Sequence, residues 1–246
     1  MKPRITRDAG IETIEPGHFR LSIAGGPGGI YRLAQLDDYT HLNRPAFAWQ
    51  APCSLEIRGR VSAPDLPGTW GFGFWNDPFS ANLGFSGMGR RLPALPIAAW
   101  FFYGSPPNFL SLKDASPAQG FLASAFSSPL IPPVLLAPGL LGLPLLALPP
   151  AARLLRRLGR RLVKDQAKTL SVDPTGWHIY RIDVQPDGSH FYVDGVEVFV
   201  TALAQRGRLG RVIWIDNQYA AFSPDGMVKF GSLANPPAWL EVEILG

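Results

Sequence analysis

Three short strand patterns joined by tight turns follow one another between Trp177 and Val200, and they constrain the fold more than any other part of the sequence. Residues 177–184 mix aromatic, β-branched and polar side chains with the alternation of a half-buried strand. Pro-Asp-Gly at 186–188 and Asp-Gly at 194–195 supply turn chemistry, the second being a two-residue hairpin signal. The segment therefore predicts an antiparallel meander.

The same pattern of strand and turn recurs along the chain. The 26 Gly and 25 Pro of its 246 residues suit many short strands joined by turns, and no fixed-period repeat, heptad or βαβ rhythm is present. We therefore predict an all-β chain, a single antiparallel sandwich over residues 1–246. Further strands are expected at Ser54–Val61, Trp70–Trp75, Ala98–Tyr103, Leu209–Tyr219 and Trp239–Ile244.

Three segments resemble the laminarinase and β-glucanase group of glycoside hydrolases and their lectin-like relatives. They are Ser54–Asp77 with its tryptophan-rich end, Trp177–Gly195 with its "fyvDG" hairpin, and the closing strand Trp239–Ile244. This resemblance implies a concanavalin A-like jelly roll with a concave sheet that faces a ligand.

The resemblance breaks at the residues that carry the family's catalysis. That catalysis depends on a strand reading Glu-x-Asp-x-Glu, because a retaining glycosidase needs two carboxyl groups about 5 Å apart. By order along the chain the equivalent strand is Ile97–Tyr103, which contains no carboxylate. The resemblance therefore implies the scaffold without the inherited mechanism.

Other catalytic and metal-binding patterns are absent from the sequence. It has no nucleophile elbow, P-loop, dinucleotide fingerprint or His-Glu-x-x-His motif, and its four histidines and single Cys53 show no zinc spacing. We expect no metal, no cofactor and no nucleic-acid partner. The N-terminal residues 1–8 lack the apolar stretch of a secretory signal, so a cytoplasmic location is expected, with peripheral membrane attachment as the other prospect.

Polar residues that follow aromatic strands give the candidate ligand site. Asp216 and Gln218 are expected on one face, beside an indole or phenol that could serve as a stacking plate. The other interpretation is a strand end that turns into a solvated loop, and Asn76-Asp77 has the same two interpretations. The candidate ligand-binding residues are Trp75, Asn76, Asp77, Trp100, Tyr103, Trp214, Asp216, Asn217, Gln218 and Tyr219.

An apolar and then basic insertion is predicted at residues 128–168. Pro129–Pro150 has the length of a membrane span, but its prolines and glycines argue against a continuous transmembrane helix. The next residues predict a short amphipathic helix with leucines on one face and arginines largely on the other. A membrane contact and an apolar lid or protein contact both fit the candidate residues Leu140, Leu141, Leu145, Leu146, Leu154, Leu158, Arg156, Arg157, Arg160 and Arg161.

Three functional hypotheses follow. The first is a non-catalytic module that binds a glycan or an amphiphile, near an anionic membrane surface. The second is an enzyme on this scaffold, a hydrolase or an isomerase or cyclase of apolar substrates, with Asp216 as acid or base. The third is an assembly protein in which the insertion forms a homo-oligomer contact.

Overall fold

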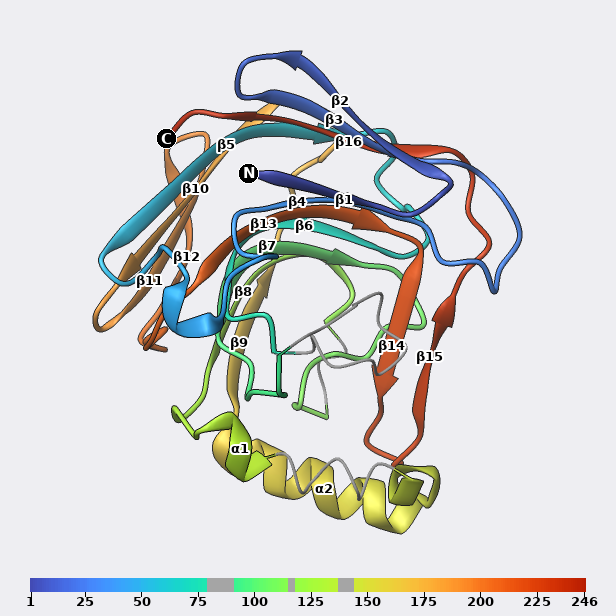
Figure 1. The fold of residues 1–246 in the computed structure, drawn as a ribbon, viewed down its shortest axis with the longest axis vertical. Helices are drawn as coiled ribbons and strands as arrows, with labels where there is room; N and C mark the ends of the chain where they lie inside the picture. Colours follow the sequence, from blue (N-terminus) through green and yellow to red (C-terminus); the bar gives the residue numbers. More distant parts are fainter. Residues whose placement is uncertain (79–90, 115–117, 137–143) are drawn as a thin grey trace.

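The predicted β-sandwich is confirmed in a computed structural model, which describes residues 1–78, 91–114, 118–136 and 144–246. Two seven-stranded antiparallel sheets stack face to face (Figure 1). The outer sheet runs in the order β12 (Val196–Thr201), β11 (Gly188–Val193), β10 (His178–Gln185), β5 (Cys53–Val61), β16 (Ala238–Ile244), β3 (His18–Ile23) and β2 (Ala9–Glu15). The inner sheet runs in the order β1 (Lys2–Ile5), β4 (Leu33–Asp37), β13 (Gly210–Asp216), β6 (Thr69–Trp75), β7 (Ala98–Gly104), β8 (Gly120–Ser127) and β9 (Lys164–Thr169).

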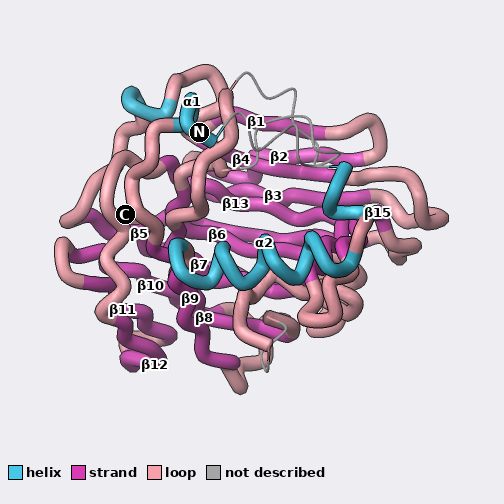
Figure 2. The backbone as a smooth tube through the Cα atoms, turned by 90° about the horizontal axis from the view of Figure 1, so that it is seen from below, coloured by secondary structure: helices cyan, strands magenta, loops and turns pink. Residues whose placement is uncertain are grey.

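The inner sheet is concave on the side that faces away from the outer sheet (Figure 1). A separate hairpin of β14 (Gln218–Phe222) and β15 (Val228–Ser232) descends along one side of this concave face. Helix α2 (Pro149–Leu162) runs beneath the concave face, and in Figure 2 it lies in front of β6 and β7. The short helices η1 (Arg44–Ala46) and α1 (Pro133–Leu136) complete the described elements.

Strict alternation along the inner strands separates the core from the concave face. On β6, Trp70, Phe72 and Phe74 are buried between the two sheets, and on β7 Phe101 and Tyr103 join them. The intervening residues must therefore point to the opposite face, since successive side chains of a strand alternate. A second apolar cluster lies on that side, containing Leu33, Phe102, Leu122, Val212 and Trp214.

The predicted meander is confirmed as β10, β11 and β12. Ile182 pairs with Phe191, which in turn pairs with Phe199. The hairpin turns at Asp194 and Gly195, whose φ angles of 51° and 79° are those of the turn that Asp-Gly predicts.

The prediction of a single strand over Leu209–Tyr219 is wrong. β13 ends at Asp216, and β14 begins at Gln218 in a different sheet. Asn217 lies between them, fully buried, and its side chain binds backbone groups of Arg32, Ile30 and Leu233. These bonds turn the chain out of the inner sheet.

The insertion is a connection between two neighbouring strands. β8 and β9 are antiparallel, and Ser127 pairs with Lys164, so residues 128–163 leave and return at adjacent positions. The expected boundary at residue 168 differs from the structure, because β9 is part of the inner sheet. The sequence of β9, KDQAKT, lacks the apolar alternation that would have indicated a strand.

Candidate functional site

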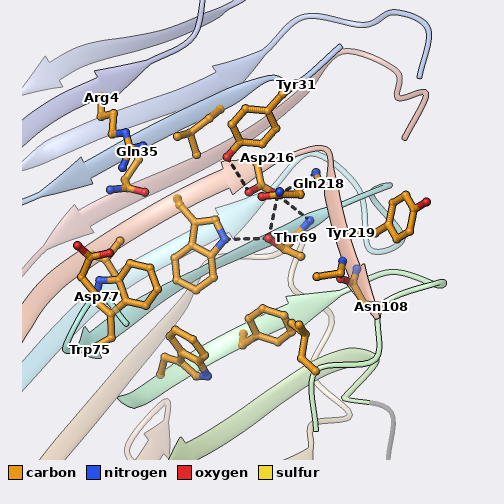
Figure 3. Close-up of a pocket in the computed structure, with 17 residues that line it drawn as sticks. Arg4, Tyr31, Gln35, Thr69, Trp75, Asp77, Asn108, Asp216, Gln218 and Tyr219 are labelled. Atoms are coloured by element: carbon orange, nitrogen blue, oxygen red, sulfur yellow. Dashed lines mark hydrogen bonds between the residues drawn. The ribbon is translucent and has the colours of Figure 1, made fainter. Parts of the chain in front are cut away.

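A pocket of about 170 Å³ lies on the concave face, between the inner sheet and β14 (Figure 3). The sheet contributes most of its apolar wall, and the β14 strand and the segment around Asn108 contribute most of the remainder. This volume is below the range of roughly 300–1,000 Å³ typical of drug-sized ligand sites. The pocket therefore accommodates a single ring or the end of a chain.

Trp100 is the centre of the aromatic wall. Its ring centroid lies 5.5 Å from that of Trp214, 5.7 Å from Phe102 and 5.8 Å from Trp75. Phe126 packs edge-on at 5.9 Å. These spacings fall in the favourable range for aromatic pairs, so the rings support one another and hold a fixed surface.

Two glycines of β6 explain how this wall lies so close to the sheet. A Cβ atom on Gly71 would lie 2.8 Å from the Trp214 ring and 2.3 Å from the carbonyl oxygen of Phe101. On Gly73 it would lie 2.6 Å from the Cβ of Trp100. The glycines of this strand therefore make room for neighbouring indoles, and the pocket is lined by those indoles rather than by the glycines.

Asp216 marks the polar end of the pocket. Its Oδ1 accepts hydrogen bonds from the Thr69 hydroxyl at 2.8 Å and from the backbone N–H of Gln218 at 3.2 Å, and its Oδ2 accepts one from the Tyr31 hydroxyl at 3.2 Å. The Thr69 oxygen in turn accepts the indole N–H of Trp214 at 2.9 Å. This chain of bonds, dashed in Figure 3, fixes the Trp214 ring relative to the carboxylate.

Burial raises the pKa of Asp216 to about 6, from a model-compound value of 3.8. The hydrogen bonds from Thr69, Gln218 and Tyr31 lower the pKa, but they do not outweigh the loss of water around the carboxylate. The group consequently changes charge near pH 6, at the buried polar end of an apolar pocket.

Donors and acceptors without protein partners remain in the pocket. Within the described part of the chain, the buried Nε1 of Trp100 has no hydrogen-bond partner. The Gln218 amide lies beside Asp216 in the same pocket and has no hydrogen bond to the described residues. Tyr219 also lines the pocket, but its hydroxyl points away from the indoles, toward Gly231 of β15 (Figure 3). Of these groups, the Gln218 amide is the one that a ligand with hydroxyl or carbonyl oxygens would bond to.

Most of the predicted ligand residues come together here. The seven that line the pocket are Trp75, Asp77, Trp100, Trp214, Asp216, Gln218 and Tyr219.

Three of the predicted residues lie elsewhere. Tyr103 has the opposite parity to Trp100 on β7, so it points into the core and stacks on Trp70 with centroids 5.6 Å apart. Asn76 is buried and binds the backbone of Leu95 and Ile97. Asn217 anchors the turn between β13 and β14, so its role is structural.

Asp77 lines the pocket but is held by a cation. Its carboxylate forms an ion pair with Arg91, and its backbone oxygen accepts a hydrogen bond from Arg44 at 2.6 Å. With φ of 48°, it occupies the left-handed region that aspartate and asparagine tolerate better than most residues. The predicted turn role and a place at the pocket therefore coexist in this residue.

Sequence reasoning missed Tyr31, Thr69 and Asn108, which also line the pocket. Thr69 shares the parity of Gly71 and Trp75 on β6, so alternation could have found it. Asn108 is fully buried and accepts the backbone N–H of Ala220, and it belongs to an irregular segment. No local pattern places such a residue, or Tyr31, beside a strand far away in sequence.

The predicted insertion residues divide into exposed and buried groups. Leu145, Leu154 and Leu158 are exposed, as are Arg157, Arg160 and Arg161, while Leu146 is half-buried. Leu140 and Leu141 lie outside the described residues.

Arg156 differs from the expectation of a surface arginine, because it is only 3% exposed. It donates to the carbonyl oxygens of Ser111 and Phe222, and at 3.3 Å to the Asp114 carboxylate. Its guanidinium also lies over the Phe109 ring, 5.1 Å from the centroid. It therefore fastens α2 to the hairpin and to the segment preceding β8.

Two other kinds of site are absent from the described ranges. No group of three or more His, Cys, Asp or Glu residues there could hold a metal ion. No helix in the described part of the chain has the length and apolarity needed to cross a membrane.

Comparison with known proteins identifies similar folds but no sequence family. No family model matches the chain, and no curated protein sequence matches it. A GlcNAcα1-4Gal-releasing endo-β-galactosidase from Clostridium perfringens is 13% identical with a TM-score of 0.47, and the alignment covers 96% of this chain but 53% of that one. The chain thus spans about half the length of that enzyme.

Two further solved structures are similar. The catalytic domain of an endo-1,3-β-glucanase (laminarinase) from Thermotoga petrophila is 12% identical with a TM-score of 0.41, covering 97% of this chain and 79% of that one. A glycoside hydrolase family 16 endo-glucanase from Bacteroides ovatus is 10% identical with a TM-score of 0.46, covering 97% and 85%. These enzymes belong to the group that the sequence resembles, and at such identities the likeness concerns the fold alone.

Proposed function

We propose that this chain is a non-catalytic binding module that holds a glycan or an amphiphile in its concave pocket, close to a membrane surface. The observation that carries the proposal is the fixed aromatic wall of Trp100, Trp214 and Phe102 beside the polar group of Asp216 and Gln218. Sugars and amphiphiles both present an apolar face or chain together with hydroxyl groups. Both would stack on the indoles and bond to the open polar groups.

Titration of intrinsic tryptophan fluorescence tests this binding. Trp100 and Trp214 are in mutual contact in the pocket wall, so a bound ligand should change their emission. We expect a saturable change with at least one member of a panel of β-glucan oligosaccharides and non-ionic glycoside detergents. Gln218→Ala should weaken that binding about tenfold, because one hydrogen bond to the ligand is lost. A panel without a saturable response would contradict the proposal.

The panel also separates the two ligand classes. Oligosaccharides without an alkyl chain should suffice if the site binds glycans, whereas only the detergents should respond if the apolar wall holds an alkyl chain. Val196→Ser is a suitable control, because Val196 is 65% exposed on β12 of the other sheet. This variant should bind like the original chain.

The protein should not hydrolyse laminarin, lichenan or agarose. The two carboxylates that line the pocket, Asp77 and Asp216, lie at opposite ends of β6, because Asp216 pairs with Thr69 and Asp77 follows Trp75. The strand alone separates them by roughly 20 Å, whereas glycosidase pairs lie about 5 Å or 6.5–9.5 Å apart. Residues 79–90, 115–117 and 137–143 contain no Asp or Glu that could complete a pair.

Reducing-sugar release from each polysaccharide measures this expectation. Turnover that persists in an Asp216→Asn variant would show that acids outside the pocket perform the reaction. Turnover that disappears in this variant would instead support the second candidate function, an enzyme that uses Asp216. The observation in favour of that candidate is the raised pKa of this buried carboxyl group, since a value of about 6 suits a general acid or base.

A further inference from the structure

Helix α2 exposes its most apolar side. The side chains of Leu154, Leu158 and Leu162, here called the leucine row, are 55%, 46% and 42% exposed. They recur every four residues and therefore form one line along the helix. A helix that served only to cover the sandwich would bury such a line and expose its charges.

The helix is held in this orientation by the opposite side. Ala152, Arg156 and Val163 are buried, and Gly159 lies against Leu112. The N-terminal end packs on the hairpin turn, where a Cβ on Gly226 would lie 2.3 Å from the carbonyl oxygen of Pro149. Small residues and one buried cation thus fix the helix. Leu154 and Leu158 are two residues, or about 200°, around the helix from Arg156, so the leucine row points away from the protein.

A second line of residues gives the exposed surface its charge. Arg153, Arg157 and Arg161, here called the arginine row, are exposed and precede each leucine of the leucine row by one residue. The two rows therefore lie side by side, about 100° apart on the helix. The helix sequence PPAARLLRRLGRRL contains five arginines and no carboxylate.

We infer that α2 docks on an anionic bilayer, with the leucine row in the acyl boundary and the arginine row at the lipid headgroups. This inference rests on the membrane part of the proposed function and names the face that makes the contact. An anionic bilayer offers apolar chains and negative charge together, which matches the two rows. A second copy of α2 matches them poorly, because it would bring two sets of arginines against each other.

The arrangement also sets the orientation of the pocket. α2 and the pocket are on the same side of the inner sheet, the concave one, and Arg156 connects α2 to the end of β14 through the Phe222 carbonyl oxygen. A bilayer at the outer side of α2 would therefore lie on the side of the molecule that carries the pocket. Amphiphiles and membrane glycolipids are the ligands that such an orientation favours.

Flotation with vesicles tests the docking. Intact protein should float with phosphatidylcholine vesicles that contain phosphatidylserine, and raised salt should weaken this because the arginine contribution is screened. Pure phosphatidylcholine should retain much less protein. Changing the leucine row to serine should lower the partition into anionic vesicles by at least roughly tenfold. The arginine row changed to glutamine should remove the dependence on phosphatidylserine.

A matched control uses apolar residues of similar exposure elsewhere. Val196 and Val200 are 65% and 52% exposed on β12, so their change to serine should leave flotation intact. The docking is wrong if the leucine-row variant floats like the original protein, or if the original protein floats with neither vesicle. Fluorescence titration with soluble ligands would still report on the pocket in either case.

Mass measurement in solution distinguishes docking on a membrane from binding of a second copy of the chain. A monomer with and without the leucine-row change agrees with membrane docking. A dimer that the leucine-row change converts into monomers would show that the surface binds a second copy, and would overturn the inference.

Discussion

Replacing Trp100 by alanine should lower the free energy of unfolding by about 3 kcal/mol, at the lower end of the range for buried Trp→Ala changes. The residue is half-buried, but four aromatic rings pack around it, so its removal leaves a cavity that those rings fill only in part. The same change should abolish ligand binding, because Trp100 is the centre of the pocket wall. Denaturant unfolding and fluorescence titration measure the two effects separately.

Trp239 provides the matched control for this change. It lies on β16 of the outer sheet, where its ring contacts the guanidinium groups of Arg20 and Arg60, both 5.3 Å from the centroid. Trp239→Ala should cost only about 1 kcal/mol and leave ligand binding unchanged. Equal effects of the two changes on binding would mean that the pocket is not the ligand site.

The charge of Asp216 should make the folded chain less stable as pH rises from about 4 to above 6. The unfolded chain ionises this group near 3.8, whereas burial holds its pKa at about 6 in the folded state. Between these values the folded state binds the proton more tightly, so stability contributed by the protonated group is present at low pH and lost as pH rises. The difference corresponds to about 3 kcal/mol.

Comparison with Asp216→Asn isolates this contribution from those of other groups. The unfolding free energy of the original chain minus that of the variant should fall by about 2.5 kcal/mol between pH 4 and 7. Asp225→Asn is the control, because the Ser223 hydroxyl lowers the pKa of this exposed carboxyl group. The corresponding difference in unfolding free energy for Asp225→Asn should depend on pH more weakly, and it should rise with pH where that for Asp216→Asn falls. A flat difference for Asp216 would show that the carboxylate is not desolvated.

Local patterns predicted the strands that alternate and the turns that need glycine. The meander of β10 to β12 and the strands β5, β6, β7 and β16 all carry that information in their own residues. β1 and β9 do not, because edge strands with polar sequences look like loops. The break at Asn217 also escaped prediction, because its cause is a set of hydrogen bonds to segments far away in sequence.

The candidate site shows the same division. Asp216, Gln218 and Trp214 could be predicted, because polar residues follow an aromatic strand end. Tyr103 was expected in the pocket but lies in the core. The alternation of side chains along β7 is present in the sequence and already separates Tyr103 from Trp100. The orientation of α2 could not be predicted, because it depends on a buried Arg156 whose partners come from the hairpin and from the Ser111 segment.

The pairing of Ser127 with Lys164 has a consequence for the order in which the chain folds. β8 and β9 are neighbours in the sheet, yet residues 128–163 make their pairing a distant contact along the chain. Closing a loop of this length costs about 2.5 kcal/mol more than closing a two-residue turn. The β8–β9 pair should therefore form later than a hairpin such as β10–β11, and a short Asn-Gly turn grafted between Ser127 and Lys164 would make this edge of the sheet a local hairpin too.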